Sequence, residues 1–192
     1  MRLENSFEVP AAPEQAWDLL LDVPRIVPCM PGAELKETVD DSNWKADVAV
    51  KLGPVSLKFA TDVKREEVDE AARRVTLSAN GREMRGRGAA RAKVESSLAA
   101  VNGGTRVDIV TDLNLSGPAA QYGRGMVADV SSQLIGRFAD CLKKHLEAPP
   151  AEAEQAVTEA AQPVSGLRLG VAAFLRSLLR SFQRLMRRLF KL

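Results

Sequence analysis

The residue types that most often carry chemistry are few in this 192-residue chain: two cysteines, Cys29 and Cys141, and a single histidine, His145. Their spacing does not match the paired ligands of a zinc or iron–sulfur site, so we expect no metal site. The chain begins without an apolar segment of the signal-peptide type, which predicts a cytoplasmic protein whose cysteines are reduced thiols. We expect His145 to pack or to cap a helix end rather than to catalyse.

The sequence offers no recognisable catalytic constellation. No Ser-His-Asp, Cys-His or close carboxylate pair falls on the faces that are expected to point inward. Residues 81–88 hold three glycines and three arginines, but neither a helix start nor the Gly-Lys-Ser/Thr ending of a phosphate-binding loop follows them. We therefore expect a flexible basic loop at a rim, and a protein that is not an enzyme.

Charge is divided unevenly along the chain. Residues 167–192 contain seven cations and no carboxylate, which leaves 20 cations against 25 carboxylates in residues 1–166. On a helical projection, the apolar side chains of this tail fall within one arc of about 160° and six cations fall on the opposite arc. The apolar arc comprises Leu167, Val171, Phe174, Leu175, Leu178, Leu179, Phe182, Leu185, Met186, Leu189, Phe190 and Leu192, and the cationic arc comprises Arg176, Arg180, Arg184, Arg187, Arg188 and Lys191.

This amphipathic pattern predicts a helix that lies on a membrane surface. A spanning helix would bury several arginines, at about 2.5 to 3.5 kcal/mol each. A cationic helix with one large apolar face suits the plane of an anionic membrane, and the residues of both arcs, apart from Leu192, are then membrane-binding. Docking in the groove of a partner and folding back over the protein's own acidic domain remain open alternatives. Confinement of the cations to the tail argues against nucleic-acid binding.

Residues 1–148 carry the patterns of one packed domain, and the Ala-, Pro- and Glu-rich residues 149–166 predict a linker to the tail helix at 167–192. Apolar residues recur at every third or fourth position in the long helix expected over residues 118–147. Short helices are expected over residues 13–21 and 24–27. Strands with period-two alternation are expected at residues 2–9, from residue 33, and at 44–52, 55–63, 75–79, 90–98 and 107–115.

These elements predict an α+β fold in which a seven-stranded antiparallel sheet wraps on the long helix, with two short helices after the first strand. The inward residues Ala90 and Ala92 are small, so a volume remains between sheet and helix that either a ligand or the helix's own side chains fill. The residues expected to line this cavity are Met30, Val48, Val50, Leu57, Phe59, Leu77, Ala90, Ala92, Val94, Ile109, Leu113, Tyr122, Met126, Val130, Leu134 and Phe138.

Gly123 and Gly125 fall in the first turns of the long helix, where each costs about 1 kcal/mol relative to alanine. They indicate either a frayed or tightly packed helix start or a functional opening. In the second case, local opening would form a portal between Tyr122, Met126 and the apolar insert around Met30.

Several strings, together with the element order, resemble a known family. The order of one strand, two short helices, six strands and a closing helix is that of the helix-grip START and polyketide-cyclase-like proteins. More specifically, the chain resembles the CoxG family of carbon monoxide dehydrogenase subunits over residues 1–147. The resemblance lies in Val9-Pro10-Ala11 followed by Trp17, in Cys29-Met30-Pro31-Gly32, in Val50-Lys51-Leu52-Gly53-Pro54-Val55 and in the helix from Tyr122 to Leu142.

The resemblance implies an apolar cavity under the long helix, no demonstrated catalytic residues, and a role beside a molybdenum hydroxylase at the membrane. From this context we expect a non-catalytic protein that binds a lipid or a quinone, with no covalent cofactor. It would recruit a carbon monoxide dehydrogenase-like enzyme to the respiratory chain on the inner face of the cell membrane. Two alternatives stay open: an assembly or anchoring factor with no bound ligand, and a small-molecule enzyme of the polyketide-cyclase type. The arginines of residues 82–87 depart from the family's pattern.

Overall fold

The computed structural model describes residues 1–147, apart from positions 54 and 87. The expected linker at 149–166 and amphipathic helix at 167–192 lie outside the described residues. In chain order the elements are β1 (Arg2–Val9), α1 (Pro13–Leu21), α2 (Val23–Ile26), the 3₁₀ helix η1 (Val27–Cys29), β2 (Ala33–Thr38), β3 (Asn43–Leu52), β4 (Val55–Asp69), β5 (Arg74–Glu83), β6 (Ala89–Val101), β7 (Gly104–Leu115), the 3₁₀ helix η2 (Gly117–Gln121) and α3 (Arg124–Glu147).

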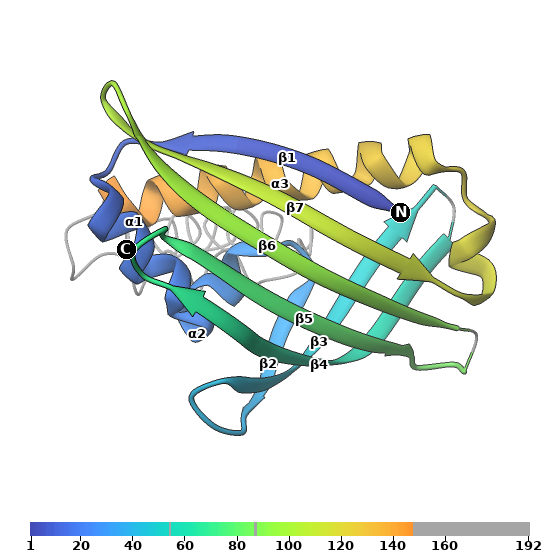
Figure 1. Ribbon diagram of the computed structural model, residues 1–192. Helices are drawn as coiled ribbons and strands as arrows, with labels where there is room; N and C mark the ends of the chain where they lie inside the picture. Colours follow the sequence, from blue (N-terminus) through green and yellow to red (C-terminus); the bar gives the residue numbers. More distant parts are fainter. Residues whose placement is uncertain (54, 87, 148–192) are drawn as a thin grey trace, which may run out of the picture. The chain divides into compact units, whose positions relative to one another are not determined.

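One antiparallel sheet holds all seven strands in the order β1-β7-β6-β5-β4-β3-β2 (Figure 1). Each strand pairs with its neighbour in the chain, except that β1 pairs with β7. The long helix α3 runs along β1, and α1, α2 and η1 lie near the C-terminal end of α3 (Figure 1). We call residues 13–30, which comprise these three short helices and the Met30 cap, the insert. The arrangement confirms the predicted α+β helix-grip fold.

The turn that leads from the insert into β2 explains one of the sequence strings. Gly32 has a φ of +81°, in the left-handed region that favours glycine. A Cβ at this position would lie 2.2 Å from the backbone oxygen of Ala49 on β3. The backbones approach closely because Ala49 N donates a 2.8 Å hydrogen bond to Gly32 O. The glycine of the Cys-Met-Pro-Gly string therefore secures the insert to the sheet.

The long helix begins later than the sequence predicts. Residues Gly117–Gln121 form η2, the backbone at Tyr122 is extended, and α3 starts only at Arg124. Gly123 has a low helix propensity and lies at the break, so the single helix expected over residues 118–147 is two pieces.

The basic loop is shorter than predicted, because β5 continues to Glu83 and takes up part of the loop expected at residues 81–88. The sequence suggested a loop because Gly81 resembles a strand breaker. In the structure Gly81 is a strand residue at which neighbouring side chains approach closely: an added Cβ would lie 3.0 Å from Thr61 Oγ1 and 3.1 Å from Phe59 Cβ.

Buried apolar side chains form two clusters at the two ends of α3. The first joins Phe138 and Leu142 of α3 to Trp17 of the insert and to residues of the sheet. The second gathers around Leu57 on β4, with Val130 of α3 packed against it. The small residues Ala79, Gly81 and Ala92 belong to neither cluster.

Candidate functional site: an apolar cavity beneath the long helix

A cavity of about 450 Å³ lies between the sheet and α3. All seven strands, the insert, η2 and α3 contribute to its wall. Among the described residues that line it, none carries an ionisable side chain. The volume falls in the range of about 300 to 1,000 Å³ that is usual for small-molecule sites. The wall therefore suits an uncharged, largely apolar molecule.

Most of the predicted cavity residues do line this space. Two of the sixteen do not: Met126 is 42% exposed on the outside of α3, and Tyr122 packs against the cluster around Leu57. The predicted residues that the structure places on the wall are Met30, Val48, Val50, Leu57, Phe59, Leu77, Ala90, Ala92, Val94, Ile109, Leu113, Val130, Leu134 and Phe138.

Small side chains on adjacent strands account for the empty volume. Ala92 on β6 pairs directly with Ala79 on β5, and Ala90 pairs with Gly81. All four residues line the cavity. The sequence indicated Ala90 and Ala92, but the cross-strand pairing adds their two partners, so the depression in the sheet is two residues wide on each strand.

Four residues on the wall carry hydroxyl groups and were not among the cavity residues predicted from the sequence. They are Thr61, Ser96, Thr111 and Ser131. Ser131 Oγ accepts a 3.1 Å hydrogen bond from Asn5 Nδ2, which leaves its own O–H able to donate. Thr61, Ser96 and Thr111 fall on inward positions of the alternating strands, and Ser131 is four residues from both Val127 and Ile135 on α3. Helical spacing from those two neighbours was the signal that could have identified Ser131.

A single portal cannot be formed by Tyr122, Met126 and Met30 together, because Met30 lies near one end of α3 and the other two residues lie near the other end. Met30 packs with the cluster that contains Phe138, near the helix C-terminus, whereas Tyr122 belongs to the cluster at the helix start. The sequence could not show which end of the helix the insert covers. An opening at the helix start would therefore not involve the insert.

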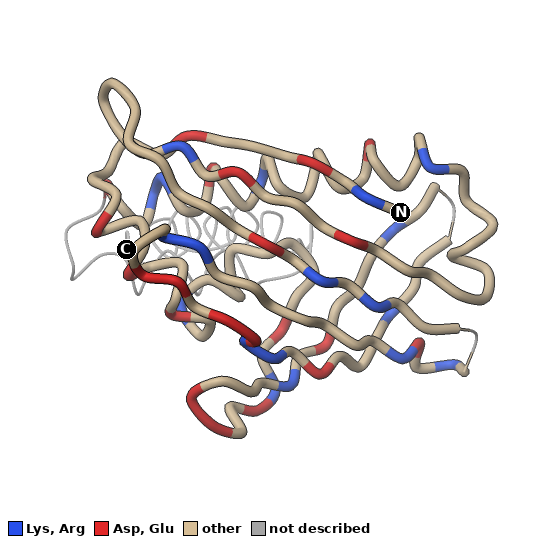
Figure 2. The backbone as a smooth tube through the Cα atoms, viewed as in Figure 1, with Lys and Arg blue, Asp and Glu red and all other residues tan. Residues whose placement is uncertain are grey.

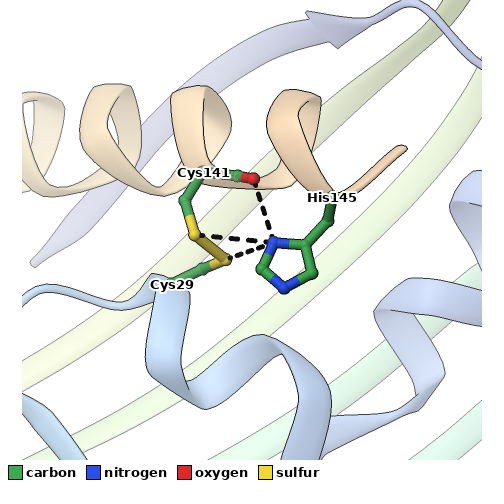
Figure 3. Close-up of a disulfide and its surroundings, with 3 residues drawn as sticks. All are labelled: Cys29, Cys141 and His145. Carbon is green, nitrogen blue, oxygen red and sulfur yellow. Dashed lines mark hydrogen bonds between the residues drawn. A yellow bond between two sulfur atoms is a disulfide. The ribbon is translucent and has the colours of Figure 1, made fainter. Parts of the chain in front are cut away.

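The two cysteines, predicted to be reduced thiols, form a disulfide between η1 and α3 (Figure 3). Their Cα atoms are 5.3 Å apart although 112 positions separate them in the chain, a proximity that only the fold reveals. His145, one turn beyond Cys141, points its Nδ1 at this bond: Nδ1 lies 3.5 Å from Cys29 Sγ and 3.8 Å from Cys141 Sγ. Nδ1 is also 3.1 Å from Cys141 O, which can only accept, so Nδ1 carries the hydrogen.

The same three residues bring together the atoms that a metal site would need. Their ligand atoms all lie within 4.8 Å of one another, which the spacing in the sequence did not suggest. A metal ion binds cysteine as the thiolate, and in the disulfide each sulfur is bonded to the other. In this state the cluster is a disulfide with a neighbouring imidazole rather than a set of ligands.

Comparison with models of protein families shows which family the chain belongs to. Residues 6–147 match the model of CoxG, a family of carbon monoxide dehydrogenase subunits. The chain belongs to the CoxG family. The matched region ends with α3 and contains the insert, the cavity and the disulfide. No match to this CoxG-family chain was found among curated proteins.

Solved structures share the fold of this CoxG-family chain at low sequence identity. A conserved protein from Geobacillus kaustophilus is similar with a TM-score of 0.65 and 20% identity, covering 83% of this chain and 97% of its own. A START superfamily protein from Mycobacterium smegmatis has a TM-score of 0.53 and 16% identity, with coverages of 76% and 97%. The Zhui aromatase/cyclase from Streptomyces sp. R1128 has a TM-score of 0.54 and 15% identity, with coverages of 85% and 99%. The likenesses establish the START-like fold.

Charged residues of the CoxG-family domain are spread along the strands and the loops (Figure 2). Both signs are interspersed along the strands. Arg82 and Arg85, at the β5–β6 turn, are exposed and do not line the cavity. Within residues 1–147, no helix is both long and apolar enough to cross a membrane.

Proposed function

We propose that this CoxG-family chain is a non-catalytic binding protein for a lipophilic molecule, and that it serves a carbon monoxide dehydrogenase-like molybdenum enzyme at the membrane. The observation that carries the proposal is the cavity of about 450 Å³ whose described wall has no ionisable side chain. A charged substrate would be desolvated there without a partner, at a cost of several kcal/mol or more, whereas an apolar one gains from burial.

The hydroxyl groups on the wall favour a ligand with a few acceptor oxygens over a pure hydrocarbon. Thr111 lies on β7 and Ser131 on α3, so hydroxyl donors are available from the sheet and from the helix. A quinone has an apolar ring and tail and two carbonyl oxygens, and each oxygen can accept one such bond. A quinone is also the membrane carrier to which an oxidising enzyme can pass electrons. We therefore propose a quinone as the ligand, with a lipid as the alternative.

General acid–base catalysis needs a side chain that exchanges a proton near neutral pH. The described wall offers hydroxyls, a thioether and indole and phenyl rings, none of which does so. This supports binding over catalysis, although one fold neighbour is an aromatase/cyclase. The family name supports carbon monoxide dehydrogenase as the partner.

The test is to purify the full chain without detergent, extract it with organic solvent and identify any bound molecule by mass spectrometry. Protein with no ligand is then titrated with decylubiquinone, following quenching of tryptophan fluorescence, since Trp44 lines the cavity. Saturable quenching at one quinone per chain is expected. Absence of both a co-purified lipophilic molecule and quinone binding would contradict the proposal.

A further inference from the structure

The Cys29–Cys141 disulfide joins the two elements that close one end of the cavity. Cys29 ends η1, between Val27 and Met30, which both line the cavity. Cys141 is on α3, one turn beyond Phe138, which also lines it. The covalent bond therefore holds the insert and the long helix together at the edge of the ligand space.

Little else of a polar kind holds the insert to α3. Within the described part of the chain, no hydrogen bond or ion pair links residues 13–30 to α3, apart from the contact of Cys29 Sγ with His145. The insert is instead hydrogen-bonded to the sheet, for example where Arg65 Nη1 donates to Leu21 O at 3.2 Å. Without the disulfide, the insert would stay attached to the sheet and would meet α3 through apolar packing alone.

The surroundings of the two sulfurs favour attack on Cys141 and departure of Cys29 in thiol–disulfide exchange. Cys29 is 4% exposed, whereas Cys141 and His145 are half-buried, which favours Cys141 over Cys29 as the residue that an incoming thiolate attacks. Attack there forms an S–S bond to Cys141, and Cys29 leaves as a thiolate beside the N–H of His145. A nearby N–H or imidazolium stabilises a departing thiolate and can supply its proton.

We propose that this disulfide is a redox latch on the insert end of the cavity, opened by exchange with a dithiol. A dithiol gives up two electrons and two protons: its first sulfur bonds to Cys141, its second displaces Cys141, and it is released as a disulfide. The protein is left with two thiols. Reduction frees the insert to move away from α3 and speeds ligand exchange there. The latch rests on the proposed function in one respect, namely that the cavity holds an apolar ligand.

The test compares the full chain oxidised with glutathione disulfide and reduced with dithiothreitol. The uncharged dye N-phenyl-1-naphthylamine serves as the probe, and its release into excess cyclodextrin is followed by stopped-flow fluorescence. Reduction should speed release by about tenfold, since local opening of the insert no longer requires breaking a covalent bond. Amide hydrogen exchange at residues 23–29 should accelerate by a similar factor. Mass spectrometry with a thiol-blocking reagent counts free thiols in each state.

Two variants separate the latch from general destabilisation. The double variant Cys29→Ala with Cys141→Ala should release the probe at the reduced rate in both buffers. His145→Gln should form the same disulfide and show the same probe release in each state. Its reduction by dithiothreitol should nevertheless be slower by about fivefold, because the leaving sulfur loses its neighbouring imidazole.

The outcomes distinguish failure of the latch from failure of the proposed function. Probe bound in both states, with equal release and equal protection of residues 23–29, overturns the latch and leaves ligand binding intact. Two free thiols after treatment with glutathione disulfide overturn it as well. If neither the probe nor decylubiquinone binds in either state and no lipophilic molecule co-purifies, the proposed function fails. Hydrogen exchange still decides the latch: faster exchange on reduction supports it, and unchanged exchange overturns it.

Discussion

Asn5 on β1 uses both ends of its amide to hold Ser131 and Ser132 of α3. Its Nδ2 donates to Ser131 Oγ at 3.1 Å, and its Oδ1 accepts from Ser132 Oγ at 3.3 Å. The residues are 126 and 127 positions apart in sequence. This pair of bonds fixes the middle of the helix to an edge strand, beside the cavity that Ser131 lines.

Replacing Asn5 by alanine should lower the free energy of unfolding by about 1 to 3 kcal/mol, because the partly buried Ser131 hydroxyl loses its partner. Urea denaturation measures the change. Ser6→Ala is the matched control, since Ser6 is the next residue on β1 and is exposed. Equal destabilisation by the two variants would show that the Asn5 bonds do not hold the helix.

Filling the depression in the sheet should block the cavity. Ala92→Phe places a ring against Ala79 and should abolish quinone binding while costing about 1 to 3 kcal/mol of stability, as overpacking typically does. Arg91→Phe, which adds the same ring on the exposed face of β6, is the control. If Ala92→Phe instead stabilises the protein by several kcal/mol, the ring has filled an unused void. If quinone binding is unchanged, the quinone binds at another site.

Stiffening the start of α3 should slow ligand exchange if the portal lies there. A Cβ at Gly123 or Gly125 meets no atom within 4 Å, so alanine fits at both positions. The double alanine variant should raise the free energy of unfolding by up to about 1 kcal/mol, from helix propensity at Gly125, and so raise the melting temperature. It should slow probe exchange more than it changes the affinity for the probe. Gly136→Ala is equally unobstructed and lies mid-helix, so it should stabilise without slowing exchange. Identical exchange rates in all three proteins would remove the portal.

The tail prediction concerns residues outside the described structure. A chain ending at Ala148 should fold with unchanged melting temperature and lose co-sedimentation with phosphatidylglycerol-containing liposomes. The reason is that it lacks both the apolar arc and the cations of residues 167–192. Full-length protein with Arg180→Glu and Arg184→Glu tests the electrostatic part alone. Equal co-sedimentation of full-length and shortened chains would exclude the membrane surface as the target.

The turn between β2 and β3 should contribute acid-sensitive stability. Hydrogen bonds from the backbone N–H of Ser42 and from the Asn43 side chain lower the pKa of Asp40 below its ordinary value of 3.8. A group whose folded pKa is lowered stabilises the fold above its unfolded pKa and ceases to do so as pH falls through the folded value. Asp40→Ala should therefore be less stable than the parent at neutral pH, with the difference closing below pH 3.8. Urea denaturation of the two proteins at a series of pH values measures this difference.

Most of the fold could be predicted from the spacing of apolar residues in the sequence, which differs between strands and helices. The inward faces of β3 and β4 could be predicted because polar and apolar residues alternate strictly there. The start of α3 could not, since a stretch with glycine and proline can continue a helix or break it, and tertiary packing decides. Gly81 misled for a related reason: glycine is chosen there for a close approach inside a strand rather than for a turn.

What brings distant residues together could not be predicted from one sequence. The alignment of Ala79 with Ala92 depends on strand register, and register follows from the whole sheet. The same limit applies to Cys29 and Cys141, whose proximity depends on which end of α3 the insert covers. The error over Met30 and the error over the cysteines therefore have one origin.

Cys29 and Cys141 also close a covalent ring around the positions between them, which include every strand except β1. If the two ends of the oxidised chain are pulled apart, only the segments outside this ring can lengthen. A contour of roughly 370 to 400 Å, from 112 positions at full extension, stays hidden from the force until the sulfurs separate. Reduction thus sets how far the domain can be unravelled as well as how firmly its insert is held.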